Sequence, residues 1–203
     1  MGLGRVKQLV GHWVAMPQLE MVWPEDRLSR APTWTLADGF HLRTYRPGDA
    51  KAWSRLMARA GFDGCDERLL RAGLLRTIPD GFFMVVRGDE IAATAMAHHN
   101  PSPLHPSGGQ VSWVAADPAY RGRGLGFAVS AAVTARLLQA GYRRIYLETD
   151  DWRLPAIRMY LKLGYLPFLY RPNMRERWRT VCGQCDFPFE PERWITPEAR
   201  APL

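Results

Sequence analysis

The feature that most constrains this chain is a glycine-rich segment, residues 117–126, between an expected strand and an expected long helix. Its glycines stand at alternate positions, Gly122, Gly124 and Gly126. Glycine lets a backbone turn tightly and approach a ligand closely. The first N–H groups of a helix lack partners within it and lie at the positive end of its dipole. With Arg121 and Arg123 beside them, these groups predict a phosphate-binding loop.

Two common phosphate-binding patterns do not fit this segment. The P-loop needs a lysine followed by serine or threonine after its last glycine, and none is present. The dinucleotide pattern Gly-x-Gly-x-x-Gly begins at Gly122 and Gly124 but meets Phe127 where a third glycine is needed. A flexible turn with incidental glycines therefore remains the alternative to a phosphate-binding loop.

The positive charge is concentrated around the same region. The formal net charge is +7, and arginine supplies 24 of the 27 basic residues. Residues 121–162 carry 8 basic against 3 acidic side chains. Such clustering favours one anionic partner over a general effect on solubility. A basic nucleic-acid-binding domain would also be cationic, but the chain has no recognisable motif of that class, so we expect no nucleic-acid partner.

Periodicity and turn residues predict a succession of strands and helices. We expect strands over 40–45, 81–87, 90–97, 110–115, 145–149 and 165–170, and helices over 49–60, 66–78, 125–140, 155–163 and 174–181. Asp49 is the expected N-cap of the first helix, and residues 79–81 are expected to end the second. Alternating strands and helices in the second half predict an α/β fold with a mixed sheet and a parallel pair of strands.

The chain divides by residue composition and patterning into three segments. Residues 1–39 read as an irregular arm packed through its tryptophans, 40–170 as the main domain, and 171–203 as a helical and coil extension packed on it. No stretch approaches the roughly 20 apolar residues that span a bilayer, so we expect no membrane partner. Three cysteines and no apolar leader predict reduced thiols and a cytoplasmic location.

Three motifs in order resemble the GNAT superfamily of acyl-CoA-dependent N-acetyltransferases. Arg121, Gly124 and Gly126 match the family's Arg/Gln-x-x-Gly-x-Gly/Ala loop. Residues 156–165 look like its Ala-Ile-x-x-Tyr-x-x-x-Gly-Phe signature, and residues 42–50 resemble its opening strand and helix. The resemblance covers roughly 40–170 and leaves out the arm and the tail.

The resemblance implies a splayed sheet that holds acetyl-CoA, or another acyl-CoA, between two central parallel strands. The implied cofactor-binding residues are Val114, Ala115, Ala116, Arg121, Gly122, Arg123, Gly124, Leu125, Gly126 and Arg153. Arg153 stands where the family often has an asparagine that contacts the cofactor, so this chain departs from the family pattern at that position. The implied co-substrate also gives the clustered positive charge a phosphate-bearing partner.

The resemblance also implies catalytic roles. Tyr160 matches the tyrosine that donates a proton to the departing CoA thiolate, and its alternative is packing against Tyr165. Glu148 is the candidate base, acting through water, and its alternative is a structural role. His98 and His99 are further candidates for the base, although a histidine pair there is more often solvated surface. The backbone amide of Val114 is the candidate oxyanion donor.

The leading hypothesis is therefore an acetyl-CoA-dependent N-acyltransferase acting on a small-molecule or peptide amine. The alternative is a catalytically inactive acyl-CoA-binding or regulatory module of the same fold. No metal is expected, because Cys182 and Cys185 lack a second ligand pair at zinc spacing. The acceptor pocket is expected near 61–80, 100–109 and the segment after Tyr165. Tail tryptophans such as Trp178 are expected to cover the core or an oligomer surface, such as that of a homodimer.

Overall fold

The computed structural model describes residues 6–9, 12–15 and 17–198. They fall into two compact units. The large unit is Trp23–Leu147, and the small unit combines Met1–Val22 with Glu148–Pro202.

The sheet of the large unit begins with four antiparallel strands, β4(His41–Thr44), β5(Thr77–Arg87), β6(Glu90–His99) and β7(Gly109–Ala116). The next strand, β8(Ile145–Thr149), runs parallel to β7, with Gly109 opposite Ile145 and Gln110 opposite Tyr146. The predicted mixed sheet with a parallel pair is therefore confirmed. Gly88, with φ of 56°, makes the hairpin turn between β5 and β6, the two strands expected over 81–87 and 90–97.

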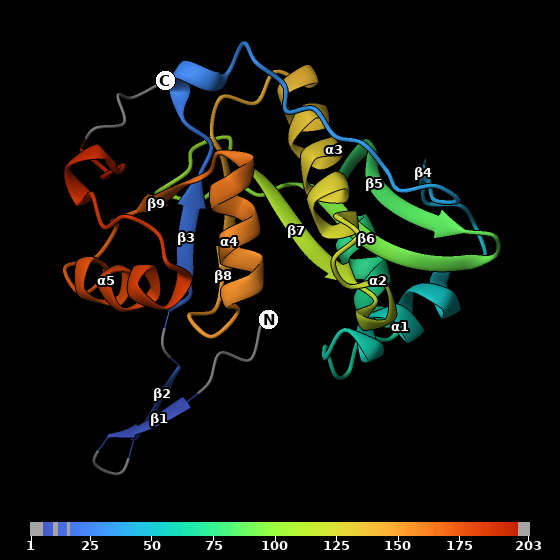
Figure 1. Ribbon diagram of the computed structural model, residues 1–203, viewed down its shortest axis with the longest axis horizontal. Coiled ribbons are helices and arrows are strands. Elements are labelled where there is room, and N and C mark those ends of the chain that lie inside the picture. Colours follow the sequence, from blue (N-terminus) through green and yellow to red (C-terminus); the bar gives the residue numbers. More distant parts are fainter. Residues whose placement is uncertain (1–5, 10–11, 16, 199–203) are drawn as a thin grey trace. The chain divides into compact units, whose positions relative to one another are not determined.

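The helices of the large unit are η1(Glu25–Arg27), α1(Ala50–Arg59), α2(Glu67–Leu74), η2(Pro118–Tyr120) and α3(Leu125–Gln139). Buried side chains of α1, among them Trp53 and Met57, share a core with Met84 of β5 and Met96 of β6. Because side chains alternate along a strand, the buried alanines beside Met96 on β6 face the other way. Helix α3 contacts β5, β6 and β7 (Figure 1), and it is apolar nearly all round, as a covered helix must be.

The small unit contains β1(Val6–Leu9), β2(His12–Ala15), β3(Leu19–Val22), α4(Leu154–Leu163), β9(Leu166–Phe168), α5(Met174–Cys185) and η3(Pro191–Arg193). Strands β1 and β2 form an antiparallel pair, and β3 pairs antiparallel with β9. Gly164 ends α4 in the left-handed conformation, with φ of 115°. In α5, Trp178 is fully buried and packs edge-to-face on Trp194.

Four local predictions were wrong or incomplete. Helix α2 stops at Leu74, and residues 79–81 lie inside β5, where a register shift between Thr77 and Phe82 accommodates them. The arm is not wholly irregular, because it supplies β3. Helix α5 continues past residue 181 to Cys185. Asp49 occupies the N-cap position of α1, but its carboxylate binds the Arg43 guanidinium at 2.7 Å and makes no capping bond.

Among the described residues, no helix is both long enough and apolar enough to cross a membrane.

Candidate functional site

The glycine-rich loop is held in place by its first residue, Asp117. The Asp117 carboxylate accepts a hydrogen bond from the Ala119 N–H at 2.9 Å and caps the short helix η2. The same carboxylate, which is largely buried, forms a 2.6 Å ion pair with Nε of Arg59 on α1. The loop that follows is therefore attached both to the end of β7 and to α1.

The loop then turns through two glycines into α3. Gly122 has φ of 81° and Gly124 has φ of 70°, conformations that other residues adopt only with strain. Gly124 is the N-cap of α3, so the N–H groups of Leu125, Gly126 and the residue after them have no partner within the helix. A Cβ added at Gly122 or Gly124 would meet nothing within 4 Å. This open, N–H-lined turn has the form of an anion cradle.

Arginine side chains add positive charge to the loop. Arg121 and Arg123 are exposed, and the Arg123 guanidinium lies 5.9 Å from the centre of the Phe40 ring. The helix dipole of α3 and these two cations act in the same direction, because both favour a negative charge at the loop. The geometry therefore fits the phosphate-binding prediction better than it fits an incidental turn.

Strand β7 carries a bulge just before this loop. Ser112 pairs with Met96 and Ala115 with Thr94, so Trp113 and Val114 together face one residue of β6. Trp113 has φ of 53°, which a bulky residue adopts only in a special setting. A bulge takes its extra residue out of the regular ladder and redirects the backbone. Val114 therefore lies where the ladder is interrupted, as a backbone oxyanion donor requires.

The other edge of β7 is paired only at its start. Among the described residues, β7 pairs with β8 at Gly109 and Gln110 and at no later position. Ala115 and Ala116 remain paired with β6 on their other side. Backbone groups further along β7 are therefore left for other partners, and the amides of a pantetheine chain have suitable donors and acceptors.

In the small unit, the structure brings Arg153 close enough to Tyr160 to affect its titration. Tyr160 is buried on α4 and packs edge-to-face against Tyr165, with ring centres 6.3 Å apart. Burial raises the pKa of Tyr160 well above its usual value, and the charge of Arg153 opposes this increase. The hydroxyl therefore stays protonated at neutral pH. The contact with Tyr165 agrees with the packing alternative and leaves a catalytic role open.

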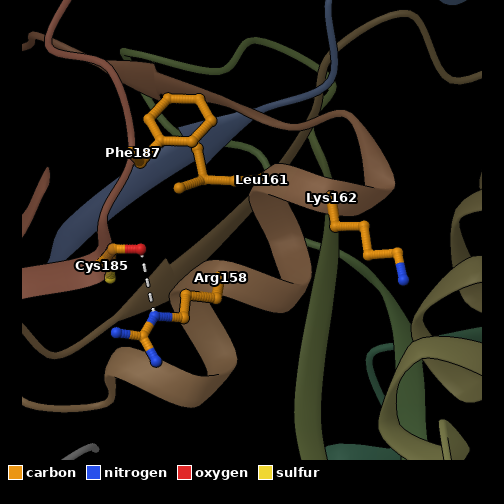
Figure 2. A pocket seen from close by; sticks show the side chains of 5 residues that line it. All are labelled: Arg158, Leu161, Lys162, Cys185 and Phe187. Atoms are coloured by element: carbon orange, nitrogen blue, oxygen red, sulfur yellow. Dashed lines mark hydrogen bonds between the residues drawn. The ribbon is translucent and has the colours of Figure 1, made fainter.

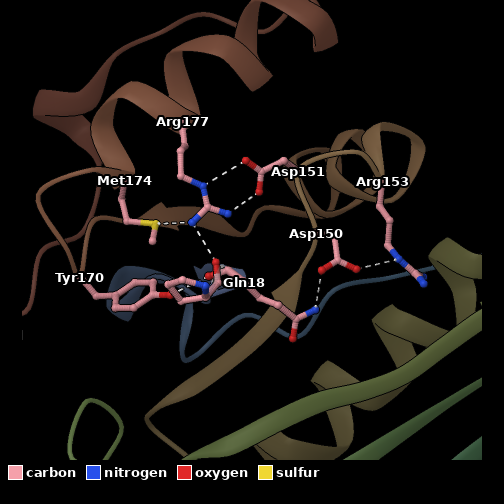
Figure 3. A network of polar contacts seen from close by, with 8 residues as sticks. Gln18, Asp150, Asp151, Arg153, Tyr170, Met174 and Arg177 are labelled. Atoms are coloured by element: carbon pink, nitrogen blue, oxygen red, sulfur yellow. Dashed lines mark hydrogen bonds and ion pairs between the residues drawn. The ribbon is translucent and has the colours of Figure 1, made fainter. Parts of the chain in front are cut away.

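Arg153 is itself held at the start of α4. Its Nε lies 3.3 Å from the Asp150 carboxylate, and its guanidinium lies 4.8 Å from the centre of the Trp152 ring. Asp150 also accepts a hydrogen bond from Nε2 of Gln18 at 3.1 Å (Figure 3). Arg153, which stands where the family often has asparagine, is thus held by side chains of the turn between β8 and α4.

A second cation fixes the same turn from α5. Arg177 pairs with both carboxylate oxygens of Asp151, and its Nη1 donates to the Pro17 carbonyl at 2.8 Å. The Tyr170 hydroxyl donates to the Gln18 carbonyl at 2.6 Å (Figure 3). The tail and the arm, which lie outside the resemblance, therefore order residues 150–153 within the small unit.

Glu148 is exposed near the end of β8. Burial, followed by the charge of Glu20, raises the pKa of Tyr170 to about 12, and Glu148 adds to this increase. Glu148 therefore lies near Tyr170. Exposure keeps its carboxylate in contact with water, as a base acting through water needs, and is equally compatible with the structural alternative.

The two histidines at the end of β6 have different surroundings. His98 is 2% exposed, and its Nε2 has no hydrogen-bond partner among the described residues. Burial, assisted by the charge of Arg76, lowers the pKa of His98 to about 4, so the ring is neutral at pH 7. His99 is exposed and shares a 2.9 Å hydrogen bond with the Tyr142 hydroxyl. The expectation of a solvated pair was wrong for His98.

The buried imidazole lies beside the bulge and the end of α2. A Cβ built on Gly73 would lie 3.8 Å from Nε2 of His98 and 3.7 Å from Nε1 of Trp113. Trp113 packs edge-to-face on Trp53, with ring centres 6.0 Å apart. Trp113 is not recognisable from the sequence as part of the site. Its place two residues before the end of an apolar strand gave no signal, because a bulge depends on pairing with β6.

Comparison with known proteins agrees with this geometry. The family described as "Acetyltransferase (GNAT) family" matches residues 43–165. The chain belongs to the GNAT acetyltransferase family. The match includes the bulged strand β7, the anion cradle and helix α4, so the resemblance found in the sequence is confirmed.

Curated relatives of this GNAT chain include two named mycothiol acetyltransferase. The protein from Amycolatopsis mediterranei is 36% identical over 156 residues, which are 70% of this chain and 49% of the relative. The protein from Thermobispora bispora is 32% identical over 148 residues, with 66% and 49% covered. The chain thus spans about half the length of the curated relatives it matches.

Solved structures of other proteins share the fold. A GCN5-related N-acetyltransferase from Sphaerobacter thermophilus matches with a TM-score of 0.57 at 24% identity, covering 75% of this chain and 49% of that one. Ard1 from Thermoplasma volcanium matches with a TM-score of 0.53 at 18% identity, covering 62% of this chain and 82% of that one.

Among the described residues of this chain, no group of three or more histidine, cysteine or acidic side chains is arranged to hold a metal ion.

Proposed function

We propose that this GNAT protein moves an acetyl group from acetyl-CoA to a primary amine by direct attack in a ternary complex. The observation that carries the proposal is the anion cradle, where two glycines with positive φ and the first turn of α3 present N–H groups beside Arg121 and Arg123. A CoA pyrophosphate supplies the negative charge that such a cradle favours. Family membership supports acetyl transfer as the reaction.

The chemistry then needs three contributions from the protein. The neutral amine attacks the thioester carbonyl carbon, and the N–H of Val114 in the bulge is proposed to donate to the oxyanion. The C–S bond breaks, and its electron pair leaves with the CoA sulfur. Glu148 is proposed to accept the proton lost by the amine through a water molecule, and Tyr160 is proposed to donate to the sulfur.

Burial changes the acidity of the Tyr160 hydroxyl and therefore its role in the proposed reaction. A phenol with a raised pKa is a weaker acid than one in water, but it remains a hydrogen-bond donor at every physiological pH. We propose that Tyr160 stabilises the thiolate by hydrogen bonding and that the nearby cation of Arg153 assists. Arg153 then has a role at the thiolate side of the site instead of the contact made by the family's asparagine.

The test measures CoA release and acetylated product with a panel of amines: a peptide N-terminus, a polyamine, an amino sugar and the des-acetyl form of mycothiol. The last belongs in the panel because the curated relatives are named for mycothiol. We expect transfer to at least one amine. Acetyl-CoA binding without transfer to any amine would favour the inactive-module alternative, and failure to bind acetyl-CoA would refute the proposal.

Two conservative variants assign the roles within that assay. Tyr160→Phe keeps the edge-to-face contact with Tyr165 and removes the hydroxyl, so we expect kcat to fall about tenfold or more with acetyl-CoA affinity unchanged. Glu148→Gln removes the carboxylate that is proposed to accept the proton of the attacking amine, so we expect kcat to fall with acetyl-CoA affinity unchanged. A Tyr160→Phe protein with unchanged kcat would leave only the packing role.

A further inference from the structure

The small unit has a pocket that the proposed acetyl transfer does not use. Its volume is about 250 Å³, and it is lined by Arg158, Leu161, Lys162, Cys185 and Phe187 (Figure 2). Arg158 and Lys162 stand four residues apart on α4 and therefore share one face of that helix. Leu161 and Phe187 supply apolar wall. Arg158 and Lys162 give the lining of this pocket positive charge, which suits a small anionic molecule.

The thiol in this pocket has a second thiol behind it. Cys182 and Cys185 lie three residues apart on α5 and are both buried, whereas Gly183 and Gln184 between them are exposed. Three residues of α-helix separate Cα atoms by about 5 Å, within the range of roughly 4.4–6.8 Å that a disulfide bridges. The charge of Cys185 contributes to the raised pKa of Cys182, which also indicates that the two sulfurs are close.

Arg158 makes the two cysteines different. Its Nη2 donates to the Gln184 carbonyl at 2.7 Å and its Nε to the Cys185 carbonyl at 3.2 Å, at the last turn of α5. Burial raises the pKa of the Cys185 thiol, and the guanidinium of Arg158 opposes that increase. Burial, followed by the charge of Cys185, raises the pKa of Cys182 to about 11. Cys185 is therefore the better nucleophile, and it is the one that faces the pocket.

We infer that this pocket is a thiol-exchange site for an anionic low-molecular-weight disulfide, with Cys185 as the attacking thiol and Cys182 as the resolving thiol. The Cys185 thiolate attacks one sulfur of the small disulfide, forming a mixed disulfide and releasing one small thiolate. The Cys182 thiolate then attacks the Cys185 sulfur, forming the Cys182–Cys185 disulfide and releasing the second. The two cysteines lose two electrons and two protons, and the small disulfide becomes two thiols.

The burial of both sulfurs sets the pace of this exchange. Thiolates are the reacting species and burial disfavours them, so the reaction is expected over minutes to hours. Once Cys185 is in the mixed disulfide it carries no charge, so its contribution to the raised pKa of Cys182 disappears. The first step therefore eases the second.

Mass spectrometry of the full chain with oxidised glutathione tests the inference without any acetyl-transfer assay. We expect the wild-type chain to lose two hydrogens, with a Cys182–Cys185 bridge in the peptide map. Cys182→Ala should stop at one glutathionyl group on Cys185, and Cys185→Ala should leave Cys182 unmodified. Cys65→Ala, in the large unit, is the matched control and should form the bridge as the wild type does.

The opposite results would overturn the assignment. A wild-type chain that stays reduced, or that stops at a mixed disulfide, removes the resolving role of Cys182. A Cys185→Ala chain that is still glutathionylated at Cys182 removes the attacking role of Cys185. Because the wild-type chain gives the main result, a variant that fails to fold does not decide the test.

Lys162→Gln tests the charge of the pocket and spares the bonds between Arg158 and α5. We expect it to slow the reaction with anionic oxidised glutathione about threefold, the effect of one exposed charge. The reaction with cystamine, a cationic disulfide, should not slow. Equal slowing with both reagents, or no change with either, would refute an anion-selective pocket.

Discussion

Replacing Gly124 with alanine tests whether the anion cradle depends on its backbone conformation. Gly124 has φ of 70°, and a Cβ there would meet nothing within 4 Å, so the substitution causes no clash and changes only backbone strain. A non-glycine residue in the left-handed region costs about 1–2 kcal/mol. For a chain of this size that lowers Tm by roughly 2–4 °C for each kcal/mol.

The same strain should weaken binding of acetyl-CoA. If alanine leaves the left-handed region, the first N–H groups of α3 no longer point at the same place. Hydrogen bonds to a charged group contribute about 1.5–3 kcal/mol each, so we expect the Kd for acetyl-CoA to rise about 10- to 100-fold by isothermal titration calorimetry.

Gly39→Ala is the matched control for this experiment. Gly39 has φ of 79°, also has nothing within 4 Å of an added Cβ, and belongs to the same large unit outside the loop. We expect a similar loss of Tm and no change in Kd. If Gly124→Ala binds acetyl-CoA as tightly as Gly39→Ala, the cradle is not where the pyrophosphate binds.

Two further predictions concern buried polar groups of the large unit. His98 has a pKa of about 4 in the folded chain, below its ordinary value of 6.5, so the unfolded chain takes up the proton first as the pH falls. The neutral ring therefore makes its full contribution to folding stability above pH 6.5, and this contribution is lost as the pH falls towards 4. Imidazole NMR signals of His98 should therefore not titrate between pH 8 and about 5, and a midpoint above 6 would contradict its burial. Asp117→Asn removes one charge of the pair with Arg59, whose side chain is 45% exposed, so we expect a loss of about 1 kcal/mol in urea unfolding. An Arg59→Gln and Asp117→Asn double-mutant cycle with no coupling would show that the pair contributes nothing.

Local chemistry made much of the large unit predictable. The glycines of the loop, the Gly88 turn and the apolar faces of the helices each act over a few residues, so α1, α3 and the β5–β6 hairpin follow from nearby side chains. The parallel pair also followed, because a strand, a helix and a second strand in succession favour that arrangement. The catalytic assignments of Tyr160 and Glu148 stay predictions, since burial and exposure fit more than one role for each.

The errors arose where distant segments decide the outcome. Residues 79–81 look like a helix stop, but pairing of β5 with β6 incorporates them into a strand through a register shift. His98 looks like surface until α2 covers it, and the bulge at Trp113 exists only against β6. In each case contacts with a segment distant in the sequence contribute more free energy than the local conformational preference. The position of that distant segment is not encoded in the neighbouring residues.

The family and the anion cradle could be predicted from the order of residues alone, because glycine conformations and a helix N-terminus are properties of a short, continuous segment. Other contacts became visible only in the folded chain. Strand β3 of the arm pairs with β9, Arg177 and Gln18 bind the turn that carries Arg153, and Arg158 lies against the end of α5. These contacts join residues far apart in the chain. Their free energy depends on burial and on the geometry of the partner, and neither is present until the chain has folded.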